Sequence, residues 1–264
     1  MPRRVVIHPG FHKTGTSTVQ RALRVNRAVL KPHLRSILKP PLKLACHASR
    51  GYSTWRDPIS LHKFRRRFRA ALDEIGGMPR RSLLISAEEL SGHLPGRGEL
   101  ADYSAAIPLA RAMYRSVQEV FPDTETVFFF STRMPESWLR SAYWQHVRAS
   151  NMTLDFDDYA ARYEGSADLD AIVDAVAEAV PERVERANLD TTTTLQAGPL
   201  TPLLDLCEVP LRDRAALVMD TVNEHLGEDV LQQLLEVNRT TPDIDQRNAR
   251  KQDILTRIHG GAHG

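Results

Sequence analysis

Residues 13–18 combine the side chains that a protein uses to hold an anion. One is cationic, one is a glycine and four carry hydroxyls: Lys13, Thr14, Gly15, Thr16, Ser17 and Thr18. Val19, Ala22 and Leu23 then recur at helical spacing, so a helix is expected to begin inside this stretch. The first turn of a helix leaves backbone N–H groups without partners, and the helix dipole makes that end positive. Together with the Lys13 ammonium, these groups favour a bound anion, most naturally a phosphate.

The order of these residues differs from that of the phosphate-binding loop of nucleoside triphosphatases. That loop reads G-x-x-x-x-G-K-[ST], and the Ser or Thr after its lysine holds magnesium. Here Lys13 comes two residues before Gly15 instead of directly after a glycine. The difference argues against a magnesium-dependent kinase, although an atypical P-loop kinase stays open as an alternative.

A second group of residues suited to a phosphate lies more than a hundred positions later. Arg133 closely follows residues 126–131, an apolar stretch that is typical of a central parallel strand. Its guanidinium is a planar, permanently charged fork that matches a phosphate. Pro135 favours a helix start directly afterwards. Ser141 lies about two helical turns further on, where its hydroxyl can face the same pocket.

The two patterns together resemble those of the sulfotransferases that use 3′-phosphoadenosine 5′-phosphosulfate (PAPS). The Lys-Thr-Gly-Thr-Ser order after a first strand resembles their 5′-phosphosulfate loop. The pattern Arg-x-Pro-x5-Ser-x-Tyr, from Arg133 to Tyr143, resembles their 3′-phosphate motif. The resemblance covers residues 5–23 and 127–143, with a looser similarity at residues 85–90. It implies PAPS as the donor, 3′-phosphoadenosine 5′-phosphate (PAP) as the product, and no metal.

By position, the resemblance assigns each end of the donor to one group of residues. Residues 13–18 would hold the 5′-phosphosulfate, and Arg133 and Ser141 would hold the 3′-phosphate. The chain departs from the cytosolic branch of the family because it has no clear C-terminal Arg-Lys-Gly loop. The nearest basic cluster either serves the 3′-phosphate or lies on a solvated helix face: Arg247, Arg250 and Lys251.

Sulfuryl transfer also needs a group that takes the proton of the acceptor hydroxyl or amine. Glu88 is the first candidate, because Glu88 and Glu89 follow an expected strand, residues 81–86, at the end where ligands bind in α/β sheets. One residue of register decides which of the two faces the pocket. His12, beside Lys13, is the third candidate. Lys13 is expected to stabilise the charge that builds on the departing PAP.

The bulk composition limits the classes of function. A chain of 264 residues can form one substantial α/β domain, and 42% hydrophobic and 26% charged residues are typical of a globular protein. The net charge of +2 is small for a dedicated nucleic-acid binder. Two widely separated cysteines, Cys46 and Cys207, favour free thiols in a reducing compartment. With no signal-peptide pattern and no apolar run of membrane length, a cytoplasmic protein without a membrane span is expected.

The elements that must position these residues are those of a P-loop-like fold. The resemblance implies a three-layer α/β architecture with a central, mostly parallel sheet flanked by helices. Strands are expected at residues 5–7, 81–86 and 126–131, and a threonine-rich segment is the candidate last strand, residues 188–196. Helices are expected at residues 17–30, 61–75, 107–120, 136–149, 156–163, 169–180, 200–207 and 225–237.

One sulfotransferase-like domain is expected over residues 1–264, with variable segments that would contact the acceptor. Residues 31–62 are rich in proline and basic side chains and are expected to be irregular or short-helical. Residues 91–106 are expected to form a loop, and residues 238–264 a polar C-terminal tail. The polar side chains near the first two segments fit a carbohydrate or another small molecule as acceptor. A module that binds PAP or a sulfated glycan without turnover is the non-enzymatic alternative.

Overall fold

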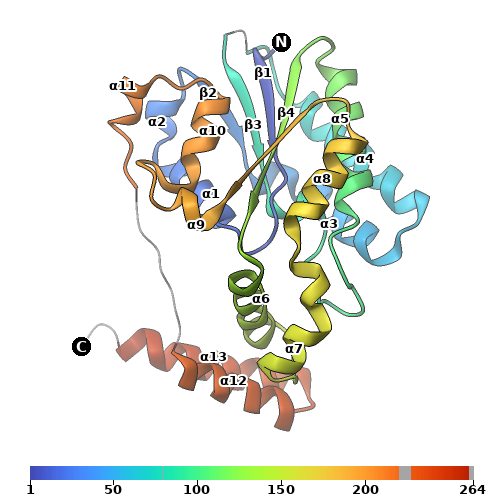
Figure 1. The fold of residues 1–264 in the computed structure, drawn as a ribbon, viewed down its shortest axis with the longest axis vertical. Helices are drawn as coiled ribbons and strands as arrows, with labels where there is room; N and C mark the ends of the chain where they lie inside the picture. Colours follow the sequence, from blue (N-terminus) through green and yellow to red (C-terminus); the bar gives the residue numbers. More distant parts are fainter. Residues whose placement is uncertain (79, 220–226, 262–264) are drawn as a thin grey trace.

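The computed structural model describes residues 1–264 except 79, 220–226 and 262–264, and only the backbone of 259–261; it contains a five-stranded sheet between two helical layers (Figure 1). The strands are Arg4–His8 (β1), Leu34–Ile37 (β2), Ser82–Ser86 (β3), Glu125–Thr132 (β4) and Arg183–Asn188 (β5). Their order is β2-β3-β1-β4-β5, and every pairing is parallel. The expected α/β class with a central parallel sheet is therefore confirmed.

The central strands are apolar on both faces, as strands covered by helices on both sides must be. The side chains of Ile7 in β1, Ile85 in β3 and Phe128 in β4 are fully buried. The register places Ile7 opposite both Ile85 and Phe128. The carboxyl ends of the three strands therefore meet at one edge of the sheet, and the loops that follow them begin side by side.

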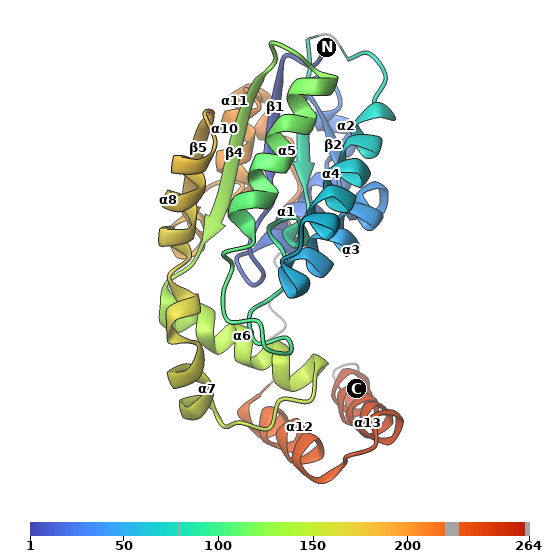
Figure 2. The ribbon, with the colours of Figure 1, turned by 90° about the vertical axis from the view of Figure 1, so that its right-hand side faces the viewer.

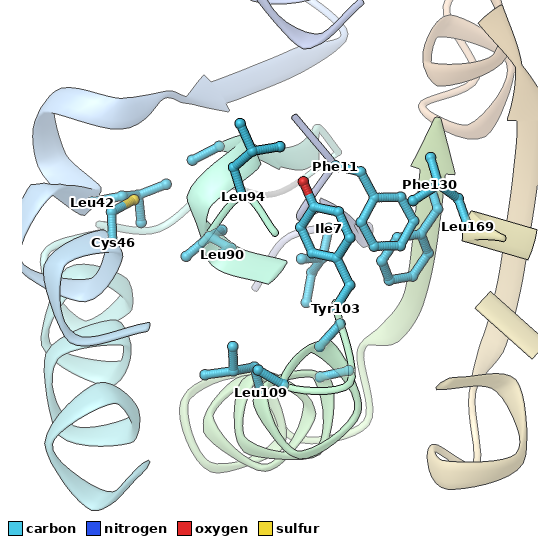
Figure 3. Close-up of a cluster of buried hydrophobic side chains, with 14 of the residues drawn as sticks. Ile7, Phe11, Leu42, Cys46, Leu90, Leu94, Tyr103, Leu109, Phe130 and Leu169 are labelled. Carbon is cyan, nitrogen blue, oxygen red and sulfur yellow. The ribbon is translucent and has the colours of Figure 1, made fainter. Parts of the chain in front are cut away.

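Helices cover the two faces of the sheet (Figures 1 and 2). One layer contains Thr16–Val25 (α1), Arg27–Leu30 (α2), Leu189–Thr192 (α9), Thr201–Leu206 (α10) and Leu211–Arg214 (α11). The other contains Lys39–Trp55 (α3), Pro58–Asp73 (α4), Ala106–Val120 (α5) and Leu169–Ala179 (α8). Each layer encloses its own hydrophobic core, and Figure 3 shows Phe11, Tyr103 and Phe130 packed together in the core on the side of α5.

Four described helices lie beyond the carboxyl edge of the sheet (Figure 2): Pro135–Ala149 (α6), Phe156–Tyr163 (α7), Glu228–Thr240 (α12) and Ile244–Gly261 (α13). Helices α12 and α13 bind the end of α6. Asn238 Nδ2 donates to the carbonyl oxygens of Val147 and Met152, and Lys251 Nζ donates to those of Val147 and Ser150. These bonds satisfy carbonyl groups that the end of a helix leaves without partners. Among the residues described, no helix combines the length and apolar composition that a membrane span requires.

Two segments that were expected to lack long elements form them. Residues 31–62 contain β2, the 17-residue helix α3 and the start of α4. Pro40 and Pro41 lie at the start of α3, where the missing N–H of proline is not needed. Most of the expected tail, residues 238–264, belongs to the end of α12 and to α13. Lys251 and Ile254 of α13 are buried against the rest of the fold.

The prediction of the last strand is also wrong. The strand is β5, at Arg183–Asn188, and the threonine-rich residues after it form α9 and turns. Thr191 Oγ1 donates to the Asn188 carbonyl three residues earlier, a bond that favours helical or turn backbone over a strand. The other expected elements match within a few residues. The helix expected at residues 225–237 is α12, and the first two residues of that prediction lie outside the described part of the chain.

Candidate functional site

The loop between β1 and α1 is tight and lies at the carboxyl edge of the sheet. Gly10, Lys13 and Gly15 have positive φ angles of 61°, 68° and 86°. A Cβ atom at Gly15 would lie 2.7 Å from Leu189 Cδ1 of α9, and one at Gly10 would lie 2.9 Å from Thr16 Oγ1. Both positions therefore require glycine, and the loop backbone can pack closely against its neighbours.

Helix α1 begins with its first turn open toward this loop. Its N-cap residue is Gly15, so no side chain caps the first backbone N–H groups. The Val19 N–H makes a helical bond to the Gly15 carbonyl at 3.1 Å. The N–H groups of Thr16, Ser17 and Thr18 precede that bond and point out of the helix start. They and the helix dipole create a positive potential beside Lys13.

The hydroxyl side chains of the loop divide into two pairs. Thr14 Oγ1 and Thr16 Oγ1 are buried and donate to the Phe11 carbonyl, at 2.7 and 3.5 Å. These two hydroxyls hold the loop together in this structure, and the backbone N–H groups of the same residues are the ones directed to an anion at the helix start. Ser17 is exposed and Thr18 is half-buried, so both side chains are at least partly accessible to a ligand.

The side chain of Lys13 is half-buried among other charges. Burial is the main cause that lowers the pKa of its ammonium; Arg148 and Arg133 act in the same direction, and Glu88 opposes them. The Arg133 guanidinium lies directly beside the loop, with Nη1 3.3 Å from the Lys13 carbonyl oxygen. Three cations face two nearby carboxylates, Glu88 and Asp190, and the excess of positive charge favours a negatively charged ligand.

Arg133 connects β4 to α6 and has capacity for a further hydrogen bond. Its Nε is buried and has no partner in the described structure. Burial lowers the pKa of the guanidinium, and the nearby Asp190 carboxylate of α9 opposes the shift. A buried donor without a partner costs about 1–3 kcal/mol, which a bound oxyanion would recover. Ser141 lies about two turns along α6 and is half-buried.

Glu89 is occupied in holding the fold. Its side chain is buried and forms ion pairs with Lys39 Nζ at 2.9 Å and with Arg50 Nη1 at 2.5 Å. Both cations come from α3, a helix that the sequence did not reveal. Glu89 therefore joins α3 to the short 3₁₀ helix after β3, Glu88–Ser91 (η1).

Glu88 is the carboxylate beside the loop. Its Cα lies 3.4 Å from the position that a Cβ on Gly10 would take. Burial and the neighbouring Glu89 raise the pKa of Glu88, while Lys39 and Lys13 lower it. The strand register alone did not decide which of the two carboxylates faces the loop. In the structure, Glu88 lies near Lys13, and the charge of Glu89 is neutralised by cations of α3.

His12 is held firmly and is neutral. Its backbone N–H donates to Tyr103 Oη at 3.1 Å, and its carbonyl accepts from Trp138 Nε1 at 2.9 Å. His12 Nδ1 lies 3.0 Å from Tyr103 Oη, so the two side chains share a hydrogen bond. Burial, followed by the charge of His93, lowers the pKa of His12 to about 3. A pKa this low makes the imidazole a weak base, whereas the pKa of Glu88 is raised, so His12 is a weaker candidate for the general base than Glu88.

Two residues that shape the site were not expected from the sequence. Tyr103 and Trp138 are buried and hold the loop through the backbone of His12. The sequence could have indicated Trp138, because it lies in the first turn of α6, five residues after Arg133. No sequence pattern indicated that Tyr103 lies at the site, because it belongs to the irregular segment before α5.

The C-terminal basic cluster does not lie with Arg133. Lys251 binds carbonyl groups at the end of α6, while Arg250 Nη1 donates to Thr241 Oγ1 at 2.6 Å and Arg247 Nη1 to the Thr241 carbonyl at 3.2 Å. A helix rises 1.5 Å per residue, so the 12 residues of α6 from 135 to 147 correspond to about 18 Å. The structure gives the cluster a role in holding helices together and gives no support to the 3′-phosphate role.

Two buried histidines tie the site to the sheet and to α6. His8 Nδ1 and Nε2 lie 3.0 and 3.1 Å from the hydroxyl oxygens of Ser86 and Ser131, so His8 links β1 to β3 and β4. His146 Nε2 donates to the Pro95 carbonyl at 2.7 Å. Burial lowers the pKa of each histidine to about 4. Both are therefore neutral near pH 7, because charging either one would bury a cation.

Lowering the pH is expected to destabilise the fold between about pH 6.5 and pH 4. The unfolded chain protonates a histidine near pH 6.5, whereas His8 and His146 resist protonation down to about pH 4. The unfolded state thus binds more protons in this window, and each group lowers the free energy of unfolding by up to about 1.4 kcal/mol per pH unit. Urea unfolding at several pH values would measure the slope. His146→Gln, which keeps a donor for Pro95, should make the slope shallower; a pH-independent free energy would contradict the prediction.

Comparisons with known proteins do not place the chain in a family. No family model matches it, and no curated protein is similar enough to count as a relative. Within the described residues, no three His, Cys, Asp or Glu side chains gather in a way that could hold a metal ion. The two motifs and the geometry around them are therefore the basis for a functional proposal.

Proposed function

We propose that this chain is a sulfotransferase that moves a sulfuryl group from PAPS to a hydroxyl or amine of a carbohydrate or another small polar molecule. One observation carries the proposal: Lys13 precedes α1, Arg133 precedes α6, and Arg133 Nη1 lies 3.3 Å from the Lys13 carbonyl. Two adjacent helix starts, each with its own cation, match a donor that carries phosphate at both its 5′ and 3′ ends. The resemblance of these same residues to the sulfotransferase motifs supports this reading.

The residues at the site fit such a donor. At the 5′ end, the N–H groups at the start of α1 and the hydroxyls of Ser17 and Thr18 can surround a phosphosulfate. At the 3′ end, the buried Arg133 Nε would gain the partner that the described chain does not supply. Ser141, on the same helix, would add a hydroxyl donor.

The proposed chemistry divides between two side chains. A bond forms from sulfur to the acceptor oxygen or nitrogen while the bond from sulfur to the phosphate oxygen of the donor breaks. Glu88 takes the proton of the acceptor, and Lys13 stabilises the negative charge on the departing PAP. The raised pKa of Glu88 makes it a stronger base than an ordinary carboxylate. The products are the sulfated acceptor and PAP.

The acceptor side is formed by the loop before α5 and by the end of α6. Arg97 Nη1 of this loop donates to the Ala149 carbonyl at 3.0 Å, which joins the two segments. The His93 ring lies 6.3 Å from the ring of His12. These side chains are polar or cationic, and they suit an acceptor with several hydroxyl groups or a negative charge.

Ligand-dependent thermal unfolding tests the proposal directly. PAP at about 100 times its Kd should add about 2.7 kcal/mol to the free energy of unfolding, which corresponds to about 5–10 °C in Tm for a protein of this size. Mg-ATP should have little effect. No shift with PAP would contradict the proposal, and a shift with Mg-ATP alone would favour a kinase. A shift with PAP but no transfer from labelled PAPS to any acceptor would indicate the non-catalytic binding module.

Glu88→Gln is expected to lower kcat by about 10²–10⁴-fold, because the amide cannot accept the proton of the acceptor. PAP binding and the free energy of unfolding should change little, since Glu88 forms none of the ion pairs that hold η1. Glu89→Gln is the matched control. It should lower the free energy of unfolding by about 1–3 kcal/mol, because Arg50 and Lys39 lose their charged partner, and it should spare the chemical step. Full activity in Glu88→Gln would reject Glu88 as the base.

A further inference from the structure

A groove of about 1010 Å³ runs along the free edge of the sheet, at β2. All four residues of β2, Leu34–Ile37, line it. Because successive side chains of a strand point to opposite faces, a groove lined by four successive residues lies over the strand's edge and not over one face. None of its lining residues belongs to the β1–α1 loop, to η1 or to α6, so it is separate from the candidate site.

The edge of β2 presents backbone groups to this groove. The Ser82 N–H of β3 donates to the His33 carbonyl at 2.9 Å. Backbone groups of a parallel strand alternate between its two sides, so the N–H and C=O groups of Leu34 and Ser36 point away from β3. No described strand pairs with β2 on that side. Such an edge is a template for pairing with another extended chain.

The walls of the groove carry an excess of positive charge. The lining contains one carboxylate, Glu74, and six basic residues: Arg24, Arg27, Lys31, Arg35, Arg67 and Arg81. In the described part of the chain, none of these six is in an ion pair with a carboxylate. The guanidinium groups of Arg67 and Arg81 donate instead to the carbonyl oxygens of Leu44 and Lys31, so their charges stay uncompensated.

The floor of the groove is apolar, which limits the ligands that fit. Leu23, Leu30 and Ile75 lie buried at its base, and Leu44 is 61% exposed at its side. A nucleic acid or a polysaccharide has few apolar groups for this floor, whereas an extended peptide can place alternate side chains on it. A second copy of this chain, paired edge to edge, would bring two sets of six cations together.

We propose that this groove binds an extended acidic peptide segment of another protein, which adds a strand to the sheet beside β2. The backbone of the segment would pair with Leu34 and Ser36, its acidic side chains would face the basic walls, and its apolar side chains would contact the floor. Main-chain hydrogen bonds would provide the affinity, and the basic walls would select for acidic side chains. This proposal does not depend on the sulfotransferase assignment.

Binding of short labelled peptides tests this proposal by fluorescence anisotropy at about 0.1 M salt. The probe is a fluorescein-labelled peptide of alternating glutamate and valine. One control replaces glutamate by lysine, and the other keeps the sequence but N-methylates alternate residues, which removes the edge-pairing N–H groups. The probe is expected to bind at least about tenfold more tightly than either control. Amide hydrogen exchange should slow at Leu34 and Ser36 when the probe binds.

Charge reversal on the protein provides the matched pair of variants. Arg35→Glu, on β2, should weaken binding of the probe at least about tenfold. Arg115→Glu, an exposed position on α5 outside the groove, should not, and neither variant should change the Tm shift with PAP. Equal binding of the N-methylated peptide, no binding of the probe, or binding only of anionic vesicles or of DNA would overturn the proposal. Dimerisation that Arg35→Glu abolishes would overturn it in favour of a second copy.

Discussion

Lys13→Met is expected to reduce sulfuryl transfer by about 10³-fold and to leave the fold intact. Methionine keeps most of the unbranched stem but removes the ammonium that would stabilise the departing PAP. The loss should not cost stability, because burial and the charges of Arg148 and Arg133 already disfavour a cation at this position. The variant should therefore unfold at the same temperature as the original chain or slightly above it.

The measurement is the single-turnover rate with labelled PAPS and an acceptor found by screening, together with Tm. Lys63→Met is the control, because Lys63 is exposed on α4 and far along the chain from the loop. It should leave both quantities unchanged. Transfer at the original rate in Lys13→Met would remove Lys13 from the mechanism and leave only an anion-binding role.

Arg133→Ala is expected to weaken PAP binding by about 2–3 kcal/mol, or about 30–150-fold in Kd. Its guanidinium would lose charge-assisted bonds to the 3′-phosphate. The same substitution removes the bond from Arg133 to the Lys13 carbonyl, so a loosened loop could also weaken binding. Adenosine 5′-phosphate, which lacks the 3′-phosphate, separates the two effects.

Calorimetric titration of both nucleotides gives the comparison. If Arg133 binds the 3′-phosphate, Arg133→Ala should lower the affinity for PAP strongly and the affinity for adenosine 5′-phosphate only slightly. Arg140→Ala is the matched control, because Arg140 is exposed on α6 and its contacts, the Glu136 carboxylate at 3.7 Å and the Phe156 ring at 4.5 Å, do not include the loop. An equal loss for both nucleotides would show that Arg133 supports the loop and does not contact the 3′ end.

The elements next to the site could be predicted because their sequences carry strong local signals. β1 and β4 are apolar runs that end at Pro9-Gly10 and Met134-Pro135, where a continuous strand cannot persist. The first turns of α1 and α6 follow directly. The positions of Lys13 after β1 and of Arg133 after β4 could therefore be predicted from the sequence. Because β1 and β4 are parallel neighbours, the two loops lie at the same edge of the sheet.

The missed elements have weak or misleading local signals. β5 lies at an edge and exposes much of its polar sequence, so it shows no apolar run. Helix α3 contains two prolines and a glycine, but the prolines lie in its first turn, where they are tolerated. Helix α13 is polar and mostly basic, and Lys251 is buried where carbonyl groups at the end of α6 accept its hydrogen bonds.

The sequence could not show which of Glu88 and Glu89 faces the loop as the candidate base, because this depends on partners far away in the chain. Glu89 is neutralised by Lys39 and Arg50, which lie about 40–50 residues earlier, on a helix that the composition did not reveal. The same holds for His12, whose ring is held by a hydrogen bond with Tyr103, about 90 residues later. Motifs identify the residues near a ligand, but contacts between distant segments decide the protonation state and direction of each side chain.

The position of β1 in the middle of the sheet affects how the chain can fold during its synthesis. Its two neighbours, β3 and β4, begin at Ser82 and Glu125, so during synthesis the first strand leaves the ribosome long before either partner exists. Pairing across such separations is slow. Val5–Ile7 have no partner strand until β3 has been made, and one edge of this strand, which is apolar on both faces, stays unpaired until β4 has been made; such a form is prone to aggregate. Truncated chains that end before Thr132 are therefore expected to need a chaperone to stay in solution.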